Sequence, residues 1–155
     1  MIPKIIRKMT ATVFSYATED EEVVANTLVA LFPDEFTENP PFEIYQEELV
    51  GQYEEPLIKF EIEVNKKTIL AKIFEWWAIQ LSDTEKRFLY RNLEKMTDMK
   101  AKTYHLRFDK FKAAEGELKL GEGSNTIKVV LKFVLYTKDL NPLRQELLDL
   151  GIIMP

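Results

Sequence analysis

The sequence predicts an α+β fold in which a mostly antiparallel sheet of five to six strands carries about four helices, mainly on one face. Three observations predict it. Apolar and polar residues alternate in several segments, most clearly in residues 57–64 and 126–136, as half-buried strands require. Other segments, such as residues 82–95, combine a capping signature with apolar residues at helical spacing. These strands and helices follow one another in mixed order, which favours an antiparallel-rich sheet.

The length of 155 residues suits one domain that spans residues 1–155. The hydrophobic content of 46% is typical of a folded protein. The absence of cysteine excludes disulfides, thiolate zinc sites and cysteine nucleophiles. No stretch has the ~20 apolar residues of a membrane span, and the N-terminus lacks the continuous apolar core of a secretory signal. We therefore expect a cytoplasmic protein that has no membrane partner.

Six segments have the alternation or the composition of strands. They are residues 4–16, 42–50, 57–64, 102–109, 117–120 and 126–136. Alternation predicts two buried rows, namely Ile58, Phe60, Ile62 and Val64 in one strand and Ile127, Val129, Leu131, Phe133 and Leu135 in another. Lys128 and Lys132 then lie on the opposite face of the last strand, together with Val130 and Val134. Residues 110–116 are expected to be irregular, and residues 121–125 form a turn.

Two capping boxes predict the starts of helices. Thr18 with Glu21 opens a helix that runs to Phe32, and Ser82 with Glu85 opens a helix to about Lys95. The expected buried residues of the two helices are Val24, Leu28, Leu31 and Phe32 in the first and Phe88, Leu89 and Leu93 in the second.

Two further helices complete the prediction. Residues 66–81 form one, and Trp76 and Trp77 near its end cannot both point inward. One of these tryptophans is expected in the core, while the other covers a rim or a subunit contact. Asn141 caps the last helix, which has Pro142 at its first position and ends at Gly151.

The residues that could carry catalysis are few. His105 is the only histidine, and the expected alternation gives it an inward, structural position. No phosphate loop, nucleophile elbow or dinucleotide fingerprint is present. The carboxylates at residues 19–22, 47–48 and 54–55 are numerous, but they read best as a helix cap and solvated faces. A magnesium site among them is the alternative. We therefore expect no enzyme activity, no cofactor and no metal.

The charge is unevenly distributed along the chain, although its net value is only −5. Residues 17–63 hold fourteen acidic residues against Lys59 alone, whereas residues 86–112 hold nine basic residues and three acidic ones. Two surfaces of opposite sign are therefore expected. The acidic one could meet a basic partner protein.

The basic stretch supplies the candidate nucleic-acid-binding residues. They are Lys86, Arg87, Arg91, Lys95, Lys100, Lys102, Arg107, Lys110 and Lys112. Arg87, Arg91 and Lys95 follow at four-residue spacing and should line one helical stripe. The others are interleaved with aromatic residues, a combination that suits phosphates and unstacked bases. The alternative is a solvated basic face above core aromatics.

Several motifs together resemble one family. They are Ala17 to Glu22 leading to Leu31-Phe32-Pro33, Gly51-Gln52-Tyr53 with Pro56-Leu57, and Leu106-Arg107-Phe108-Asp109-Lys110 with Gly116. Their order and spacing, which cover residues 6–136, are similar to those of an archaeal family of proteins labelled RNA-binding or predicted to be exosome-associated. The resemblance implies a fold like that of large-subunit ribosomal protein five, with a curved and mostly antiparallel sheet. It also implies RNA as a partner, with exosome or ribosome components as further partners.

The Arg107-Phe108-Asp109-Lys110 motif also has a structural interpretation. Phe108 would fill the core, Asp109 would accept backbone N–H groups where the strand ends, and Arg107 would pair with a carboxylate. We thus predict a non-catalytic RNA-binding protein. The alternative is a protein-interaction module or a homodimeric structural protein.

Overall fold

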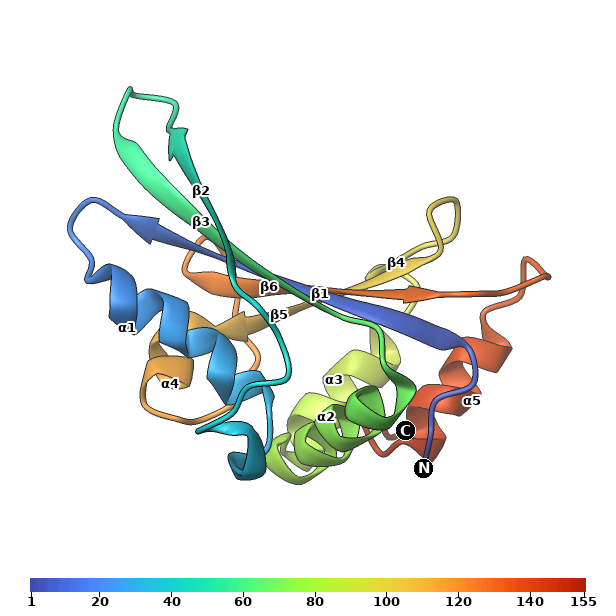
Figure 1. Ribbon diagram of the computed structural model, residues 1–155. Coiled ribbons are helices and arrows are strands. Elements are labelled where there is room, and N and C mark those ends of the chain that lie inside the picture. Colours follow the sequence, from blue (N-terminus) through green and yellow to red (C-terminus); the bar gives the residue numbers. More distant parts are fainter.

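Six strands form one antiparallel sheet, and the helices all lie on one side of it (Figure 1). The computed structural model describes residues 1–155. The strands are β1 (Ile6–Tyr16), β2 (Tyr45–Val50), β3 (Pro56–Val64), β4 (Thr97–Asp98), β5 (Thr103–Asp109) and β6 (Thr126–Phe133). Their order across the sheet is β2-β3-β1-β6-β5-β4, and every neighbouring pair is antiparallel. The predicted α+β class and the predicted arrangement of layers are confirmed.

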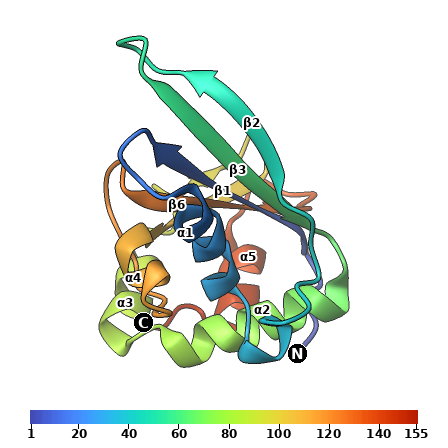
Figure 2. The same cartoon turned by 60° about the vertical axis from the view of Figure 1, so that its left-hand side comes forward.

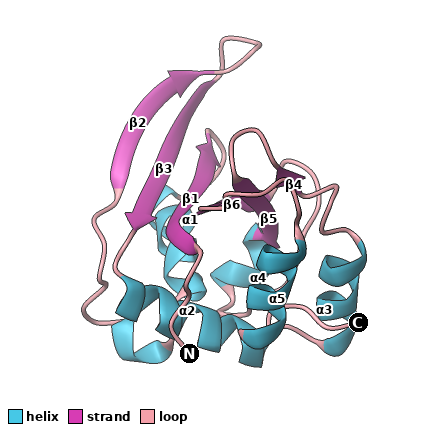
Figure 3. Cartoon of the chain, turned by 90° about the vertical axis from the view of Figure 1, so that its right-hand side faces the viewer, coloured by secondary structure: helices cyan, strands magenta, loops and turns pink.

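The helical layer consists of five α-helices and two 3₁₀ turns. The helices are α1 (Glu21–Asn26), α2 (Lys67–Gln80), α3 (Asp83–Arg91), α4 (Lys110–Ala114) and α5 (Asn141–Asp149), and the turns are η1 (Thr27–Leu31) and η2 (Asp34–Phe36). Figure 3 shows this layer in cyan below the magenta strands. No helix is long and apolar enough to cross a lipid bilayer.

The predicted helix from Thr18 to Phe32 is wrong in its start and its length. Asp20, not Thr18, is the N-cap, because its side chain accepts the backbone N–H groups of Glu22 and Val23. The α-helix then ends at Asn26 and continues as a 3₁₀ turn. At this transition the hydroxyl of Thr27 donates to the Val24 carbonyl at 2.6 Å, which competes with the helical ladder.

Other boundaries also differ from the predictions. Lys110–Ala114 is a short helix where we expected an irregular segment, because Asp109 caps it through the backbone N–H of Lys112. The expected strand at residues 117–120 is reduced to one bridge between Leu120 and Phe108. The capping box of Ser82 and Glu85 is confirmed.

The core lies between the sheet and the helices, and alternating strand residues supply much of it. Met9, Ala11 and Val13 of β1 are buried, and so are four members of the predicted inward row, Ile127, Val129, Leu131 and Phe133 of β6. The fifth member, Leu135, lies beyond the end of β6 and is half-buried. Trp77 of α2 is fully buried and donates its indole N–H to the Leu31 carbonyl at 3.0 Å. Trp76 is half-buried, packs against the core and donates to the Ala30 carbonyl. One tryptophan is therefore a core residue, as predicted.

A buried carboxylate fixes the start of β1 to the last helix. Glu146 of α5 is 6% exposed and accepts hydrogen bonds from the backbone N–H groups of Lys4, Ile5 and Ile6. Hydrogen bonds to a charged acceptor contribute more than neutral ones, and buried donors without a partner are costly. Glu146 therefore positions the chain as it enters the central strand.

We predict that Glu146→Ala lowers the free energy of unfolding by about 3 kcal/mol, because it leaves three backbone donors without their acceptor. Glu146→Gln should cost less, since one amide oxygen still accepts. Chemical denaturation monitored by circular dichroism measures both. The matched control Glu122→Ala removes an exposed carboxylate and should change stability by less than about 0.5 kcal/mol. Equal effects of Glu146→Ala and Glu122→Ala would contradict the assigned role.

Tyr104 of β5 carries a hydroxyl that has no hydrogen-bond partner. The residue is fully buried, and its hydroxyl oxygen is unpaired. Burial raises the pKa of Tyr104 above its ordinary value of 10.0, because the charged phenolate is poorly solvated in the core. The unfolded chain therefore loses this proton at a lower pH than the folded protein does.

We predict that Tyr104→Phe keeps or raises the stability at neutral pH by up to about 1 kcal/mol, because it removes an unpaired buried hydroxyl. Above pH ~10 the unfolded state of the parent protein binds fewer protons than the folded state, so its free energy of unfolding falls as the pH rises. In the Tyr104→Phe variant, the free energy of unfolding should fall less over the same pH range, because the titrating hydroxyl is absent. Denaturation series at pH 7 and at pH 10.5 for both proteins test this difference, and parallel pH dependences would refute it.

Candidate nucleic-acid interface

The side of the sheet that faces away from the helices, called the open face here, brings together basic residues from three adjacent strands. Strand register puts Lys132 of β6 opposite Lys8 of β1. Lys128 precedes Lys132 by four residues on β6, with Val130 between them on the same face, and it lies opposite Arg107 of β5. We call Lys8, Arg107, Lys128 and Lys132 the basic patch. No acidic side chain interrupts it between these positions.

The basic patch pairs like charges across strands. Residues directly opposite in an antiparallel pair have Cβ atoms about 5 Å apart, so Lys8 with Lys132 and Arg107 with Lys128 repel each other. The positive charge of the basic patch is only partly neutralised by neighbouring groups. Lys8 lies 3.4 Å from Glu63 and Arg107 donates to the Gly123 carbonyl at 3.1 Å, but Lys128 and Lys132 make no ion pair. Lys128 and Lys132 are therefore available to bind an anion.

Neutral and aromatic side chains form the floor between these cations. Thr10, Val130 and His105 lie opposite one another on β1, β6 and β5. Phe14 of β1 is half-buried, and the Lys128 ammonium lies 5.8 Å from the centre of its ring. A flat aromatic ring beside free cations on an open sheet can stack a nucleic-acid base.

The inward position predicted for His105 is wrong. Tyr104 and Leu106 point into the core, so the alternation of β5 places His105 on the open face. The residue is exposed, and its ring nitrogen Nε2 lies 2.9 Å from the Thr103 hydroxyl. The prediction was wrong because it did not use the neighbours of His105, which are both apolar and both buried, so that alternation gives the histidine an outward position.

The open face carries opposite charges on its two halves. On the β2–β3 side, Glu47 lies opposite Lys59 and Tyr45 lies opposite Glu61. Glu63 lies on the same face of β3, next to Thr10 of β1. Surfaces of opposite sign thus occur side by side on one sheet, with β1 between them, but only Arg107 of the basic patch comes from the predicted basic stretch of residues 86–112. The β2–β3 hairpin projects beyond the rest of the sheet (Figure 2).

The predicted helical stripe is only partly continuous with this patch. Arg87 and Arg91 are exposed on α3, in the helical layer, whereas Lys95 lies beyond the end of that helix. Lys95 lines a small hollow with His105 and Arg107 at the edge of β5. Phe88, expected to be buried, is 41% exposed and lines the same hollow, because Leu89 faces the core instead. The structure thus brings Lys95 to Arg107 but shows no such link for Arg87 and Arg91.

The remaining predicted cations are dispersed. Lys100 and Lys102 lie in the turn between β4 and β5, which Asp98 holds through the backbone N–H groups of Lys100 and Ala101. The carbonyl of Lys102 accepts from the backbone of Phe133, so this turn adjoins the Lys132 end of the patch. Lys86 is half-buried on α3.

Lys112 is exposed on α4, and its ammonium lies 3.8 Å from Glu115 and 3.9 Å from Glu117. Two carboxylates therefore surround the one cation, and the surface around it is not basic.

Lys110 does not belong to a binding surface. It is 2% exposed, and its ammonium donates to the Phe14 carbonyl at 2.7 Å and to Glu19 at 2.6 Å. The same ammonium lies 4.9 Å from the centre of the Tyr16 ring. These contacts connect the start of α4 to the end of β1 and to the turn before α1. Lys110 is therefore removed from the candidate set and assigned a structural role.

The structural interpretation of the neighbouring motif is confirmed at two positions and wrong at one. Phe108 is fully buried, with its ring centre 5.1 Å from that of Trp77. Asp109 accepts the backbone N–H of Lys112 at 2.9 Å. Arg107 pairs with a backbone carbonyl rather than with a carboxylate, because its strand position directs it to the open face.

Sequence reasoning missed Lys8, Lys128 and Lys132 as candidate site residues. A signal for two of them was present, since alternation already placed Lys128 and Lys132 on the polar face of the last strand. Their meeting with Lys8 depends on the pairing of β1 with β6, about 120 residues apart in the chain. A local pattern does not encode that pairing.

The fold and this surface define a class of protein, namely an α+β protein with an open antiparallel sheet and a basic patch on its uncovered face. A family model described as RNA binding matches residues 8–133. The chain belongs to this RNA-binding family.

Relatives with curated names or solved structures agree with this membership. The chain is 33% identical over 120 residues to RNA-binding protein PAB1135 of Pyrococcus abyssi, which covers 77% of this chain and 76% of that protein. The crystal structure of protein AF2318 from Archaeoglobus fulgidus, a member of family DUF54, is 27% identical and superposes with a TM-score of 0.78 over 95% of this chain and 99% of that one. A DUF54 protein from Methanothermobacter thermautotrophicus has the same fold, with 20% identity and a TM-score of 0.75 over 95% and 98% of the two chains.

We predict that Lys110→Met lowers the free energy of unfolding by about 3 kcal/mol, because it leaves the Glu19 carboxylate and the Phe14 carbonyl without their buried partner. The exposed neighbour provides a control, and Lys112→Met should change stability by less than about 0.5 kcal/mol. A double-mutant cycle with Glu19→Gln should give a coupling energy of at least about 1 kcal/mol. Strictly additive effects would show that the ion pair does not hold these elements together.

Proposed function

We propose that this protein binds RNA on the open face of its sheet, without catalysis. The observation that carries the proposal is the basic patch, in which Lys128 and Lys132 have no carboxylate partner and face further cations across the strands. Such repulsion lowers the stability of the folded protein. A polyanion that binds the patch would relieve it. The family label and the name of the Pyrococcus abyssi relative support RNA as that polyanion.

The proposed mode of binding separates two contributions. Lysine and arginine side chains neutralise phosphates, which provides most of the affinity and makes it dependent on salt. Phe14 offers a ring on which an unstacked base can lie after Lys128 moves from it to a phosphate. Since strands lie about 4.8 Å apart and residues rise about 3.3 Å along a strand, the patch measures roughly 10 Å by 13 Å. That size suits a short single-stranded segment better than a long duplex.

The charges around the basic patch favour one path for the RNA strand across the sheet. Lys100 and Lys102 extend the positive charge beyond the Lys132 end, and Lys95 extends it beyond Arg107 at the edge of β5. The acidic β2–β3 side should repel the phosphates. We therefore propose that the strand runs along β6 and β5 rather than across the sheet to the hairpin.

More specific roles stay predictions. They are an association with the exosome or the ribosome, a cytoplasmic location and a homodimer. None of them is needed for the basic patch to bind RNA.

We predict that Lys128→Gln combined with Lys132→Gln weakens the binding of single-stranded RNA at least tenfold at ~50 mM salt, because two phosphate contacts are lost. The slope of log affinity against log salt should become shallower by about 1.4, the value for two lost contacts to a single strand. The same variant should be as stable as the parent or more stable by up to about 1 kcal/mol, since cross-strand repulsion is removed. Fluorescence anisotropy with a labelled mixed-sequence RNA and thermal denaturation provide the two measurements.

Two matched variants decide where the RNA binds. Lys119→Gln with Lys138→Gln removes two exposed cations outside the patch and should leave the affinity within about twofold. Arg87→Glu with Arg91→Glu tests the helical stripe and should weaken binding less than the patch variant does. The proposed surface would be wrong if the α3 variant abolished binding while the patch variant did not. The whole function would be wrong if the parent protein failed to bind either structured or single-stranded RNA at ~50 mM salt.

A further inference from the structure

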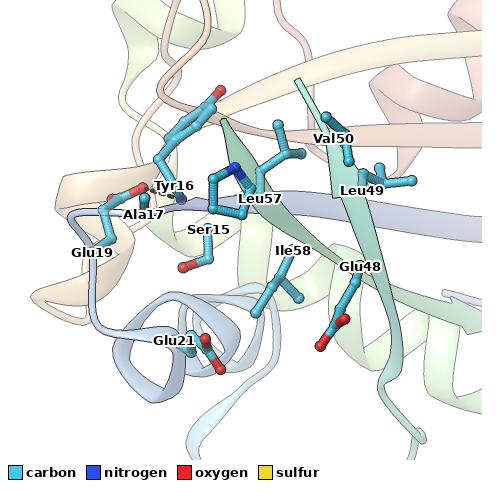
Figure 4. Close-up of a pocket in the computed structure, with 11 residues that line it drawn as sticks. Ser15, Tyr16, Ala17, Glu19, Glu21, Glu48, Leu49, Val50, Leu57 and Ile58 are labelled. Atoms are coloured by element: carbon cyan, nitrogen blue, oxygen red, sulfur yellow. Dashed lines mark hydrogen bonds between the residues drawn. The ribbon is translucent and has the colours of Figure 1, made fainter. Parts of the chain in front are cut away.

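A cleft lies on the helix side of the β2–β3 hairpin (Figure 4), and no residue of the basic patch lines it. It has a volume of about 560 Å³ and lies between the end of β1, the turn into α1 and the hairpin. Register places Ser15, Ile58 and Glu48 in one row across β1, β3 and β2. Glu21, in the first turn of α1, completes the cleft from the helical side.

The cleft is negatively charged, and two of its carboxylates are free. Glu19 already holds Lys110. Glu21 and Glu48 are exposed and make no ion pair. They belong to different elements, α1 and β2, and line the same space. Such a site repels phosphate and attracts a cation, so it does not extend the RNA surface.

Ser15 supplies an independent indication of a ligand. It is 2% exposed, and its hydroxyl has no hydrogen-bond partner. Figure 4 shows the hydroxyl on the same side of the sheet as Glu21, Ile58 and Glu48. A buried hydroxyl that lacks a partner costs about 1–3 kcal/mol. A donor that enters the cleft would satisfy it.

The lining of the cleft indicates which kind of cation it can hold. Apolar side chains of the hairpin, among them Val50, Pro56 and Ile58, share the cleft with the two free carboxylates. An ammonium on an alkyl chain suits both parts of this lining, because the chain covers apolar surface while the charged end meets the carboxylates. A lysine side chain of a partner protein has this form.

We propose that the cleft binds a lysine side chain of an extended segment of a partner protein. The lysine ammonium lies between Glu21 and Glu48 and donates to the Ser15 hydroxyl, while its alkyl chain packs on Ile58. The protein would then hold RNA on the open face and a basic protein segment on the hairpin. This second site is independent of the proposed RNA function, because the two surfaces share no residue.

The test uses a fluorescein-labelled peptide of alternating lysine and valine, and a matched peptide in which each lysine is acetylated. At ~50 mM salt the lysine peptide should bind, and acetylation should abolish binding. Glu21→Gln and Glu48→Gln should each weaken it about tenfold, because each removes a charge-assisted contact. The matched control Glu122→Gln removes one exposed negative charge elsewhere and should leave the affinity within about twofold.

Two further measurements separate the proposal from a nonspecific charge effect. Ser15→Ala should keep or raise the melting temperature, because it removes an unpaired hydroxyl. The same substitution should weaken the binding of the peptide, because the lysine loses an acceptor. Binding to the Lys128→Gln and Lys132→Gln variant should be unchanged, so that failure of this proposal and failure of the RNA proposal are distinguishable.

The proposal is overturned if the acetylated peptide binds equally well, or if Glu21→Gln and Glu48→Gln have no larger effect than Glu122→Gln. It is also overturned if spermidine binds with the same dependence on these carboxylates while the peptide does not, since the ligand would then be a free polyamine.

Discussion

The central strand β1 is held at both ends by buried charged side chains, and the rest of the sheet depends on its position. At its start, Glu146 accepts three consecutive backbone N–H groups. Near its end, Lys110 donates to the carbonyl of Phe14 and binds Glu19. Because β3 and β6 pair with opposite edges of β1, a displacement of this strand would shift the register of the whole sheet. A one-residue slip would exchange its buried and open faces.

The position of β1 also explains the division of charge on the open face. The acidic half of the sequence forms β2 and β3 on one side of β1, whereas the basic second half forms β5 and β6 on the other. A net charge of −5 therefore conceals a local positive surface. Such separation permits a protein with an acidic mean composition to attract phosphates at one place and cations at another. The two proposed sites follow from one topology.

Local sequence patterns predicted the features that depend on neighbouring residues, such as strand alternation and helix caps. They failed for features that depend on contacts between residues far apart in the chain. Alternation correctly assigned the buried row of β6, and the capping box of Ser82 and Glu85 marked the start of α3. Lys110 was misassigned because its partners, Phe14 and Glu19, lie more than ninety residues away. The basic residues near Lys110 in the sequence therefore suggested an exposed basic surface, whereas the side chain is buried among acceptors. The structure places Arg107 of the candidate set in the basic patch, but the centre of the patch depends on the β1–β6 pairing.

The contrast between Lys110 and Lys128 shows how the fold separates structural from functional charge. Both are lysines in a basic half of the chain, yet one is enclosed by acceptors and the other faces cations on an open sheet. Satisfied buried charges stabilise a fold only in their native geometry, whereas unpaired cations on a surface reduce stability unless a ligand neutralises them. Stability alone would therefore favour neutral residues at Lys128 and Lys132, although not at Lys110. The proposed RNA site would use this unpaired charge, and the proposed lysine site would likewise satisfy the free hydroxyl of Ser15 in the cleft below the hairpin.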